Sequence, residues 1–267
     1  LSECRMQRTW DEAEQAFDFS AVRQRIDDYN KSHLGSKKGF AVMPVCFGIS
    51  FTKTFLNQGS SLVHIYTDGS VSVTTGGIEM GQGISSNMIA IVARSFGISP
   101  DRVRCNSTNT SRIANISPSA ASATTDLNGN ATLIACREIL DGLKEVAAAE
   151  LGGQADDISI KDGVVLLNDT PSELVWEQLV LKTYFSRVKL MAHGFYTPTG
   201  LHYDFTKENN HPFHYYTYGT CLIETTVDCL RGNYTIDSAK VVHDLGRGII
   251  RSVDLGQVEG GMAQGIG

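Results

Sequence analysis

Glycine is distributed unevenly along this chain, and two short stretches hold much of it. The 267 residues include 26 glycines, which cluster in Gly76–Gly83 and Gly246–Gly267. Because glycine has no side chain beyond a hydrogen atom, it lets the backbone turn sharply and approach another group closely. The two stretches therefore predict tight turns at which the main chain lies against something else.

Strand and helix signals alternate irregularly along the chain. Residues 62–75 read as a hairpin that turns at Asp68-Gly69, and apolar spacing predicts helices over 12–30, 84–96 and about 126–150. Further strands are expected at 39–55, 103–107, 158–167 (as a small hairpin), 188–195, 216–228 and 234–242, and a last helix from Gln257. This mixture predicts an α+β fold of mixed sheets, hairpins and packed helices, not a doubly wound parallel sheet.

For the helix predicted over about residues 126–150, the sequence also suggests which residue caps it and which face is buried. Asp126 or Asn128 can cap its start, and Ile134, Ile139 and Leu143 fall with Leu133 and Leu140 on its inner face. In domain terms we expect residues 1–267 to form the C-terminal part of one larger domain. Its pieces would be a helical lead-in (1–36), a first α+β lobe (37–150) and a second α+β lobe (151–267) truncated at its end.

Charge and cysteine content narrow the class of protein. There are 23 Lys+Arg against 29 Asp+Glu, a net charge of −6, and no basic stripe, which argues against a nucleic-acid partner. The apolar runs are far shorter than the roughly 20 residues of a membrane span, and no secretory signal is recognisable. The six cysteines form no CxxC pair and no zinc-finger spacing, so we expect buried thiols in a reducing, cytoplasmic compartment.

The glycine-rich segment Gly76–Gly83 precedes a predicted helix. Such a turn can offer free N–H groups and the positive end of a helix dipole to an anionic ligand. It is not the dinucleotide fingerprint, because Ser86 stands where that pattern needs glycine. A purely structural turn explains the same residues, with Glu79 as a turn-fixing group.

Two other segments are polar, small and placed before predicted helices. Ser117–Asp126 could cradle a phosphate with the hydroxyls of Ser122, Thr124 and Thr125, although a solvated loop would have the same composition. Asp254–Gly265 again places a glutamine beside glycine. The amides of Gln82 and Gln257 each carry donors and an acceptor, which suits the edge of a heterocycle.

Four strings in this order resemble the molybdenum hydroxylase family. They are GISFTKTFLNQGSSLVHIYTDGSV (48–71), GGIEMGQG (76–83), SPSAASATTDLNG (117–129) and VVHDLGRGIIRSVDLGQVEGG (241–261). The resemblance covers nearly the whole chain apart from about residues 152–171. It is strongest to the molybdopterin-binding part of xanthine dehydrogenases, which the GISFT and FLNQ strings favour over aldehyde oxidases.

The resemblance implies a role for particular residues. The pterin would meet Met80, Gly81 and Gln82 on one side and Gln257 on the other. The dithiolene and phosphate end would be lined by Ala121, Ser122, Ala123, Thr124 and Thr125. Ala120 and Ala121 would form a small floor beneath the molybdenum, with the Ala121 backbone near the metal and no side-chain ligand. Phe51 would pack against a purine ring and Thr52 would hydrogen-bond it.

The resemblance also implies a reaction and partners. The chain would be part of an enzyme that hydroxylates a purine such as xanthine or hypoxanthine with water as the oxygen source. Electrons would leave through 2Fe-2S clusters to FAD on other domains or subunits. The catalytic glutamate is expected beyond Gly267, so no catalytic residue is assigned here. The partners would be the remaining half of the molybdenum domain and both redox domains, in a homo-oligomer. Two alternatives stay open: an aldehyde or other N-heterocycle hydroxylase, and a non-catalytic molybdopterin-binding or assembly protein.

Overall fold

The computed structural model describes residues 4–267, which fall into two compact units. The first unit combines the chain up to Ile49 with Tyr215–Arg247, and the second combines Ser50–His214 with Gly248–Gly267. These units do not follow the expected lobes 37–150 and 151–267. The reason is strand pairing, because a strand before residue 50 pairs with one after residue 214.

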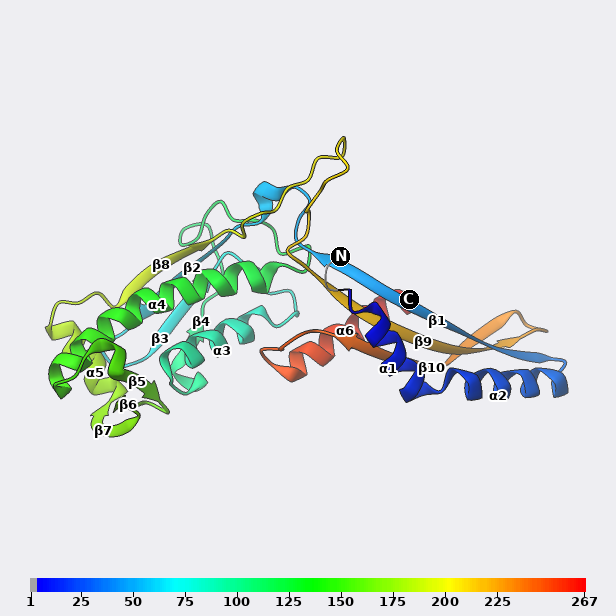
Figure 1. The fold of residues 1–267 in the computed structure, drawn as a ribbon, viewed down its shortest axis with the longest axis horizontal. Coiled ribbons are helices and arrows are strands. Elements are labelled where there is room, and N and C mark those ends of the chain that lie inside the picture. The colour runs from blue at the N-terminus through cyan, green and yellow to red at the C-terminus, as the bar shows by residue number, and fades with distance from the viewer. Residues whose placement is uncertain (1–3) are drawn as a thin grey trace. The chain divides into compact units, whose positions relative to one another are not determined.

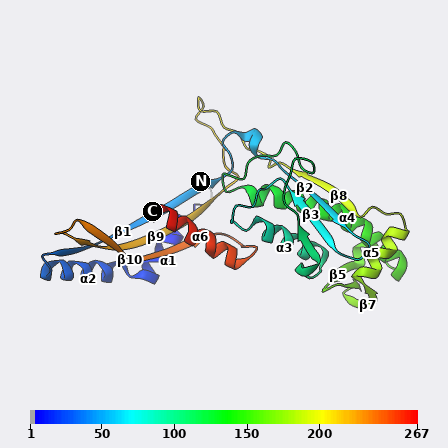
Figure 2. The ribbon, with the colours of Figure 1, turned by 180° about the vertical axis from the view of Figure 1, so that it is seen from behind.

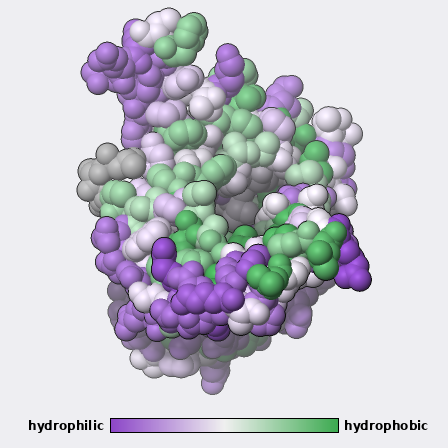
Figure 3. All heavy atoms as spheres, turned by 90° about the vertical axis from the view of Figure 1, so that its right-hand side faces the viewer, coloured by the Kyte–Doolittle hydropathy of each residue, from purple (hydrophilic) through white to green (hydrophobic). Residues whose placement is uncertain are grey.

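The first unit is an antiparallel sheet with two helices packed on it (Figure 1). The sheet order is β1 (Ser36–Ile49), β9 (Tyr215–Asp228), β10 (Asn233–Asp244), and the helices are α1 (Met6–Phe17) and α2 (Phe19–Ser32). Val22 and Ile26 of α2 pack with Leu222 of β9 into a small core. Figure 3 shows hydrophilic side chains low on the face toward the viewer, where α2 lies.

The single helix expected over residues 12–30 is two helices. Asp18 adopts a left-handed φ of 47°, which ends α1, and its carboxylate accepts a hydrogen bond from Ala21 N at 2.9 Å. An aspartate at this position caps the second helix, since its side chain satisfies an N–H that has no partner within the helix.

The second unit is built on a four-stranded sheet covered by two helices. The sheet order is β4 (Val103–Cys105), β3 (Val71–Thr75), β2 (Gly59–Ile65), β8 (Met191–Tyr196), with only β3 and β4 parallel. The covering helices are α3 (Ile84–Phe96) and α4 (Thr124–Leu151), seen from both sides in Figures 1 and 2. Fully buried Val63, Val73, Met88, Phe96 and Ile139 belong to the core between them. The predicted α+β fold is confirmed.

Smaller elements complete the second unit. They are β5 (Ile158–Lys161), β6 (Val164–Leu167), β7 (Thr170–Val175), α5 (Trp176–Phe185) and α6 (Arg251–Ile266), with 3-10 turns at Thr54–Leu56, Pro100–Arg102 and Ala155–Asp157. Neither β7 nor α5 was expected. Trp176 anchors them, because its fully buried indole N–H donates to Gly69 O at 2.7 Å.

Several expectations about helices are wrong in detail. α4 begins at Thr124 after Ala123, so Asp126 and Asn128 lie inside the helix and do not cap it. Ile139 and Leu143 are fully buried as expected, but Ile134 is 37 % exposed, because the inner face runs through Ala131, Ala135 and Ile139. α6 begins at Arg251, six residues before the expected start at Gln257.

The cysteines also differ from expectation. Among the described residues only Cys136 is buried, and burial raises the pKa of its thiol to about 12. Cys4, Cys46 and Cys229 are exposed, and the described cysteines are all unpaired. The helices of residues 4–267 are too short or too polar to cross a lipid bilayer.

Candidate functional site

The glycine-rich loop 76–83 is organised by one carboxylate. Glu79 Oε1 accepts hydrogen bonds from Gly81 N at 2.8 Å and Gly83 N at 3.0 Å, and Oε2 accepts one from Ser85 N at 2.9 Å. The N-terminus of α3 therefore already faces a negative charge, and these N–H groups are not free for an anionic ligand, as the glycine pattern had suggested. The turn-fixing role considered for Glu79 is the one observed.

These hydrogen bonds change the acidity of Glu79. Partial burial raises the pKa of its carboxyl, but the three backbone donors outweigh burial and hold the pKa below its ordinary value of 4.5. A carboxyl with a lowered pKa stabilises the folded state above its ordinary pKa, and that stabilisation is lost as pH falls through the lower, folded-state value.

We expect Glu79→Gln to lower the melting temperature at neutral pH and to flatten its acid dependence. The amide keeps one acceptor but brings no charge to the positive end of the α3 dipole. The measurement is thermal unfolding of both proteins from about pH 3 to pH 7, spanning the ordinary carboxyl range. Curves that stay parallel over this whole range would show that Glu79 does not contribute in this way.

Gln82 completes the same loop. Its Oε1 accepts from Met80 N at 2.6 Å and its Nε2 donates to Ile78 O at 2.7 Å, while the Met80 side chain is 66 % exposed. An amide has two donor hydrogens and two acceptor lone pairs, so one of each remains for a ligand. Ile78 N donates to Ser119 Oγ at 2.7 Å, which ties this loop to the segment before α4.

The segment before α4 contains an unusual turn. Ala121 and Ser122 both have left-handed φ values, 56° and 54°, and Ala123 N donates to Ala120 O at 3.3 Å. Left-handed backbone is uncommon outside glycine, and each such residue costs of order 1–3 kcal/mol, a cost that concentrates at ligand clamps and active sites. α4 then begins without a side-chain cap on Ala123. The turn thus presents small side chains and an uncapped helix start together.

Close backbone approaches bring three of the predicted segments to the start of α4. A Cβ on Gly77 would lie 2.9 Å from Thr124 Cγ2 and 3.2 Å from Asn128 Nδ2. A Cβ on Gly59 would lie 2.9 Å from Asn128 N and would collide with the carbonyl of Leu127. The start of β2, the glycine-rich loop and the Ala120–Thr125 segment therefore meet at the first turns of one helix.

The fourth segment joins them through α6. A Cβ on Gly83 would lie 2.7 Å from Val253 Cγ1, and Arg94 of α3 donates to Ile249 O at 2.7 Å. Gln257 follows Val253 by one helical turn, which places it on the same side of α6. Gln82 and Gln257 thus come from two elements in contact near Gly83.

The predicted substrate residues lie in a loop. Phe51 was expected within a strand over 39–55, but β1 ends at Ile49, so Phe51 and Thr52 precede the 3-10 turn Thr54–Leu56. The Phe51 side chain is partly buried and Thr52 is exposed. A side chain on a loop can turn toward a ligand, which a side chain locked in a sheet core cannot.

Sequence reasoning missed two asparagines beside this site. Asn87 Nδ2 donates to Thr125 Oγ1 at 3.4 Å and Asn128 Nδ2 donates to Thr124 O at 2.9 Å, yet the buried Oδ1 atom of each has no partner within residues 4–267. Buried acceptors without donors are rare and call for an explanation. Their signal in the sequence was a polar residue on the apolar side of a helix's first turn. The orphaned acceptors and the uncapped helix start fit a ligand that carries N–H donors and a phosphate.

A cavity of about 210 Å³ adjoins the glycine-rich loop. Glu79, Ser85 and Cys105 contribute to its wall, and burial raises the pKa of the Cys105 thiol although Ser85 hydrogen-bonds it. The thiol therefore stays protonated at neutral pH and is a poor nucleophile. Within residues 4–267 no group of three or more His, Cys, Asp or Glu side chains is placed to hold a metal ion.

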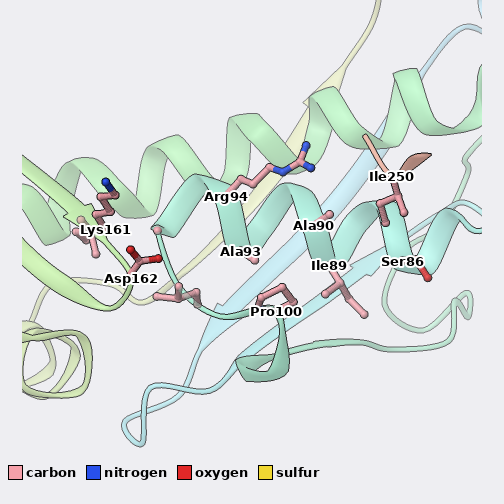
Figure 4. A pocket seen from close by; sticks show the side chains of 12 residues that line it. Ser86, Ile89, Ala90, Ala93, Arg94, Pro100, Lys161, Asp162 and Ile250 are labelled. Atoms are coloured by element: carbon pink, nitrogen blue, oxygen red, sulfur yellow. The ribbon is translucent and has the colours of Figure 1, made fainter. Parts of the chain in front are cut away.

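A larger hollow of about 700 Å³ lies along another face of α3 (Figure 4). Ile89, Ala90 and Arg94 of α3 line it together with Lys161 at the end of β5 and Ile250. It contains none of the residues predicted to bind the cofactor or the substrate.

Comparison with known proteins assigns the family. Residues 12–267 match the family described as the molybdopterin cofactor-binding domain. The chain belongs to this family, and its fold is that of a molybdopterin-binding domain of the molybdenum hydroxylase type. It is 37 % identical to the xanthine dehydrogenase/oxidase of Mus musculus over 260 residues, and 36 % identical to the xanthine dehydrogenase of Oryza sativa subsp. japonica over 267 residues. These alignments cover 97 % and 100 % of this chain but only 18 % of either relative.

Solved structures show the same fold. Quinoline 2-oxidoreductase from Pseudomonas putida 86 superimposes with a TM-score of 0.81 at 21 % identity, over 97 % of this chain and 33 % of that one. The aldehyde oxidoreductase from Desulfovibrio desulfuricans gives a TM-score of 0.75 at 22 % identity, over 98 % of this chain and 26 % of that one. The family resemblance seen in the sequence is confirmed.

Proposed function

We propose that this chain is the molybdopterin-binding part of an enzyme that hydroxylates a purine, xanthine or hypoxanthine, with water as the oxygen source. The observation that carries the proposal is the convergence of the four predicted segments at the starts of α3 and α4, together with Gly83 against α6. The similarity to xanthine dehydrogenases over nearly the whole chain supports the purine.

The proposal assigns the cofactor to residues of this chain. Met80, Gly81 and Gln82 hold the pterin from the glycine-rich loop, and Gln257 holds it from α6. The turn from Ala121 through Ser122 and Ala123 to Thr124 and Thr125 holds the phosphate end, because backbone N–H groups at a helix start favour anions. Ala120 and Ala121 leave space beneath the metal, with only the Ala121 backbone near molybdenum. Bound molybdopterin supplies the redox chemistry that oxidises an electron-poor carbon.

The rest of the enzyme lies outside these residues in this proposal. The chain spans 18 % of the length of its xanthine dehydrogenase relatives. We propose that the catalytic glutamate lies beyond Gly267. The other half of the molybdenum domain completes the site, and the 2Fe-2S clusters and FAD reside on other domains or subunits of a cytoplasmic homo-oligomer.

Phe51→Ala in the complete enzyme tests the substrate class. An aromatic contact contributes about 0.5–1.5 kcal/mol beyond its buried area, so we expect about a tenfold loss of kcat/KM for xanthine and a much smaller loss for a small aliphatic aldehyde. Phe55→Ala is the matched control, since Phe55 lies on the same loop with its side chain 71 % exposed.

Three results would redirect the assignment. Equal losses for both substrates would mean that Phe51 only supports the fold. Full activity toward aldehydes with none toward purines would favour an aldehyde hydroxylase. Molybdenum and pterin present by mass spectrometry, with no turnover of any substrate, would favour a non-catalytic cofactor-binding protein.

A further inference from the structure

One buried side chain holds the main chain of Phe51. Asn57 is 4 % exposed, and its Oδ1 accepts from Phe51 N at 2.9 Å while its Nδ2 donates to Phe51 O at 2.8 Å and to Thr54 O at 3.3 Å. Both polar backbone groups of Phe51 are thus satisfied by a single amide, as a neighbouring strand would satisfy them. Asparagine carries its donor and its acceptor on two separate atoms, so one side chain can bond both backbone groups.

The loop is also fixed on its other side. Ser50 is 7 % exposed with a φ of 149°, a conformation that favours glycine, and its Oγ accepts from His214 N at 3.2 Å. A serine persists in such a conformation when the surrounding structure compensates for the strain. Phe51 therefore lies between two restrained residues, Ser50 before it and Asn57 after it.

The same loop is tied to the candidate cofactor site. Gly59, two residues after Asn57, lies against the Leu127 carbonyl in the first turns of α4. Ser60 O accepts from Gly76 N at 3.3 Å, which connects the loop's end to the glycine-rich loop. The main chain near Phe51 is therefore tied to α4, whose start is proposed to hold the phosphate end of the cofactor, and to the glycine-rich loop, which is proposed to hold the pterin.

We propose that Asn57 is a positioning residue that fixes the main chain of Phe51, so that the Phe51 ring meets a flat heterocyclic substrate. The identity of the substrate in this inference rests on the proposed function. The hydrogen bonds from Asn57 to Phe51 do not depend on it. The role of Asn57 is preorganisation: a loop already ordered loses less freedom when the substrate binds, and small misplacements of a contacting group are costly.

Amide hydrogen exchange in the complete enzyme tests the restraint. Asn57→Ala removes the acceptor of Phe51 N–H, so we expect faster exchange at Phe51 with the overall melting temperature and the molybdenum content close to wild type. Gln58→Ala is the control, because Gln58 donates to Phe55 O at 2.6 Å in the same loop without contacting Phe51. Unchanged exchange at Phe51 in Asn57→Ala would overturn the inference.

A double-mutant cycle tests whether Asn57 acts through Phe51. We expect Asn57→Ala to lower the ratio of kcat/KM for xanthine to kcat/KM for an aliphatic aldehyde about tenfold, chiefly through KM. In the Phe51→Ala background the same change should leave the ratio unaltered. Asn57→Asp, which keeps the acceptor and loses both donations, should fall between.

The outcomes separate the inference from the proposed function. If Phe51→Ala lowers the ratio and Asn57→Ala does not, the positioning role is wrong and the substrate assignment stands. If Asn57→Ala lowers the ratio equally in both backgrounds, it acts through another residue and the inference is overturned. If Phe51→Ala leaves the ratio unchanged, the purine contact fails, whatever the exchange data show about the loop.

Discussion

Replacing Ala121 with leucine is expected to lower turnover by the complete enzyme about a hundredfold, near the upper end of what overpacking costs. Extra methylenes in a filled space typically cost 1–3 kcal/mol, and here the space is the proposed floor beneath the metal. The fold should persist, because Ala121 lies in a turn that is only partly buried. Turnover of xanthine and molybdenum content are measured beside the melting temperature.

Two variants separate lost space from altered backbone at this turn. Ala121→Gly keeps the space and suits the φ of 56°, so it should retain cofactor and activity. Ala114→Leu adds the same bulk at an exposed position of the preceding loop and should change nothing. Normal activity of Ala121→Leu would mean that the floor lies elsewhere.

Gly59→Ala, at the first residue of β2, is expected to be strongly destabilising. The new Cβ would collide with the carbonyl of Leu127 and lie 2.9 Å from Asn128 N, and backbone atoms cannot rotate away as a side chain can. We expect the free energy of unfolding to fall by about 3 kcal/mol, which is at the upper end of the cost of overpacking. The melting temperature of the purified protein is the measurement.

Gly260→Ala is the matched control for this change. Gly260 lies inside α6 and a Cβ there would meet nothing within 4 Å of this chain. Alanine in a helix interior is favoured over glycine by roughly 0.5–1 kcal/mol, so this variant should be neutral or slightly more stable. If Gly59→Ala had the same melting temperature as the wild type, the close contact between Gly59 and Leu127 would not limit stability.

Local patterns predicted the elements whose determinants are local. The helix Ile84–Phe96 was found to the residue, because its apolar spacing is regular and a glycine stands at each end. The hairpin of β2 and β3 followed from Asp68-Gly69. Asp18 broke an expected helix although it sits in a regular apolar pattern, because a left-handed φ is not visible in residue spacing.

The site was predictable in its segments but not in its internal bonding. The four strings named the loops that the structure brings together, yet the capture of three N–H groups by Glu79 depends on how the loop folds back. Asn57 was also missed, since an asparagine beside a turn has no distinguishing sequence signal until its partners are known. Close approaches such as Gly59 to Leu127 join residues far apart in the chain, which no local pattern contains.

The pairing of β1 with β9 has a consequence for how the protein is made. Ile49 pairs with Tyr215 and Ser36 pairs with Asp228. The two paired strands are therefore separated in the sequence by the whole segment 50–214. At a synthesis rate of about 5–20 residues per second, β1 leaves the ribosome roughly ten to thirty seconds before its partner. During that interval Phe40 and Val42 have no sheet to join, while α3, α4 and their strands can already assemble. Residues 50–214 must therefore be synthesised before the sheet that pairs β1 with β9 can form.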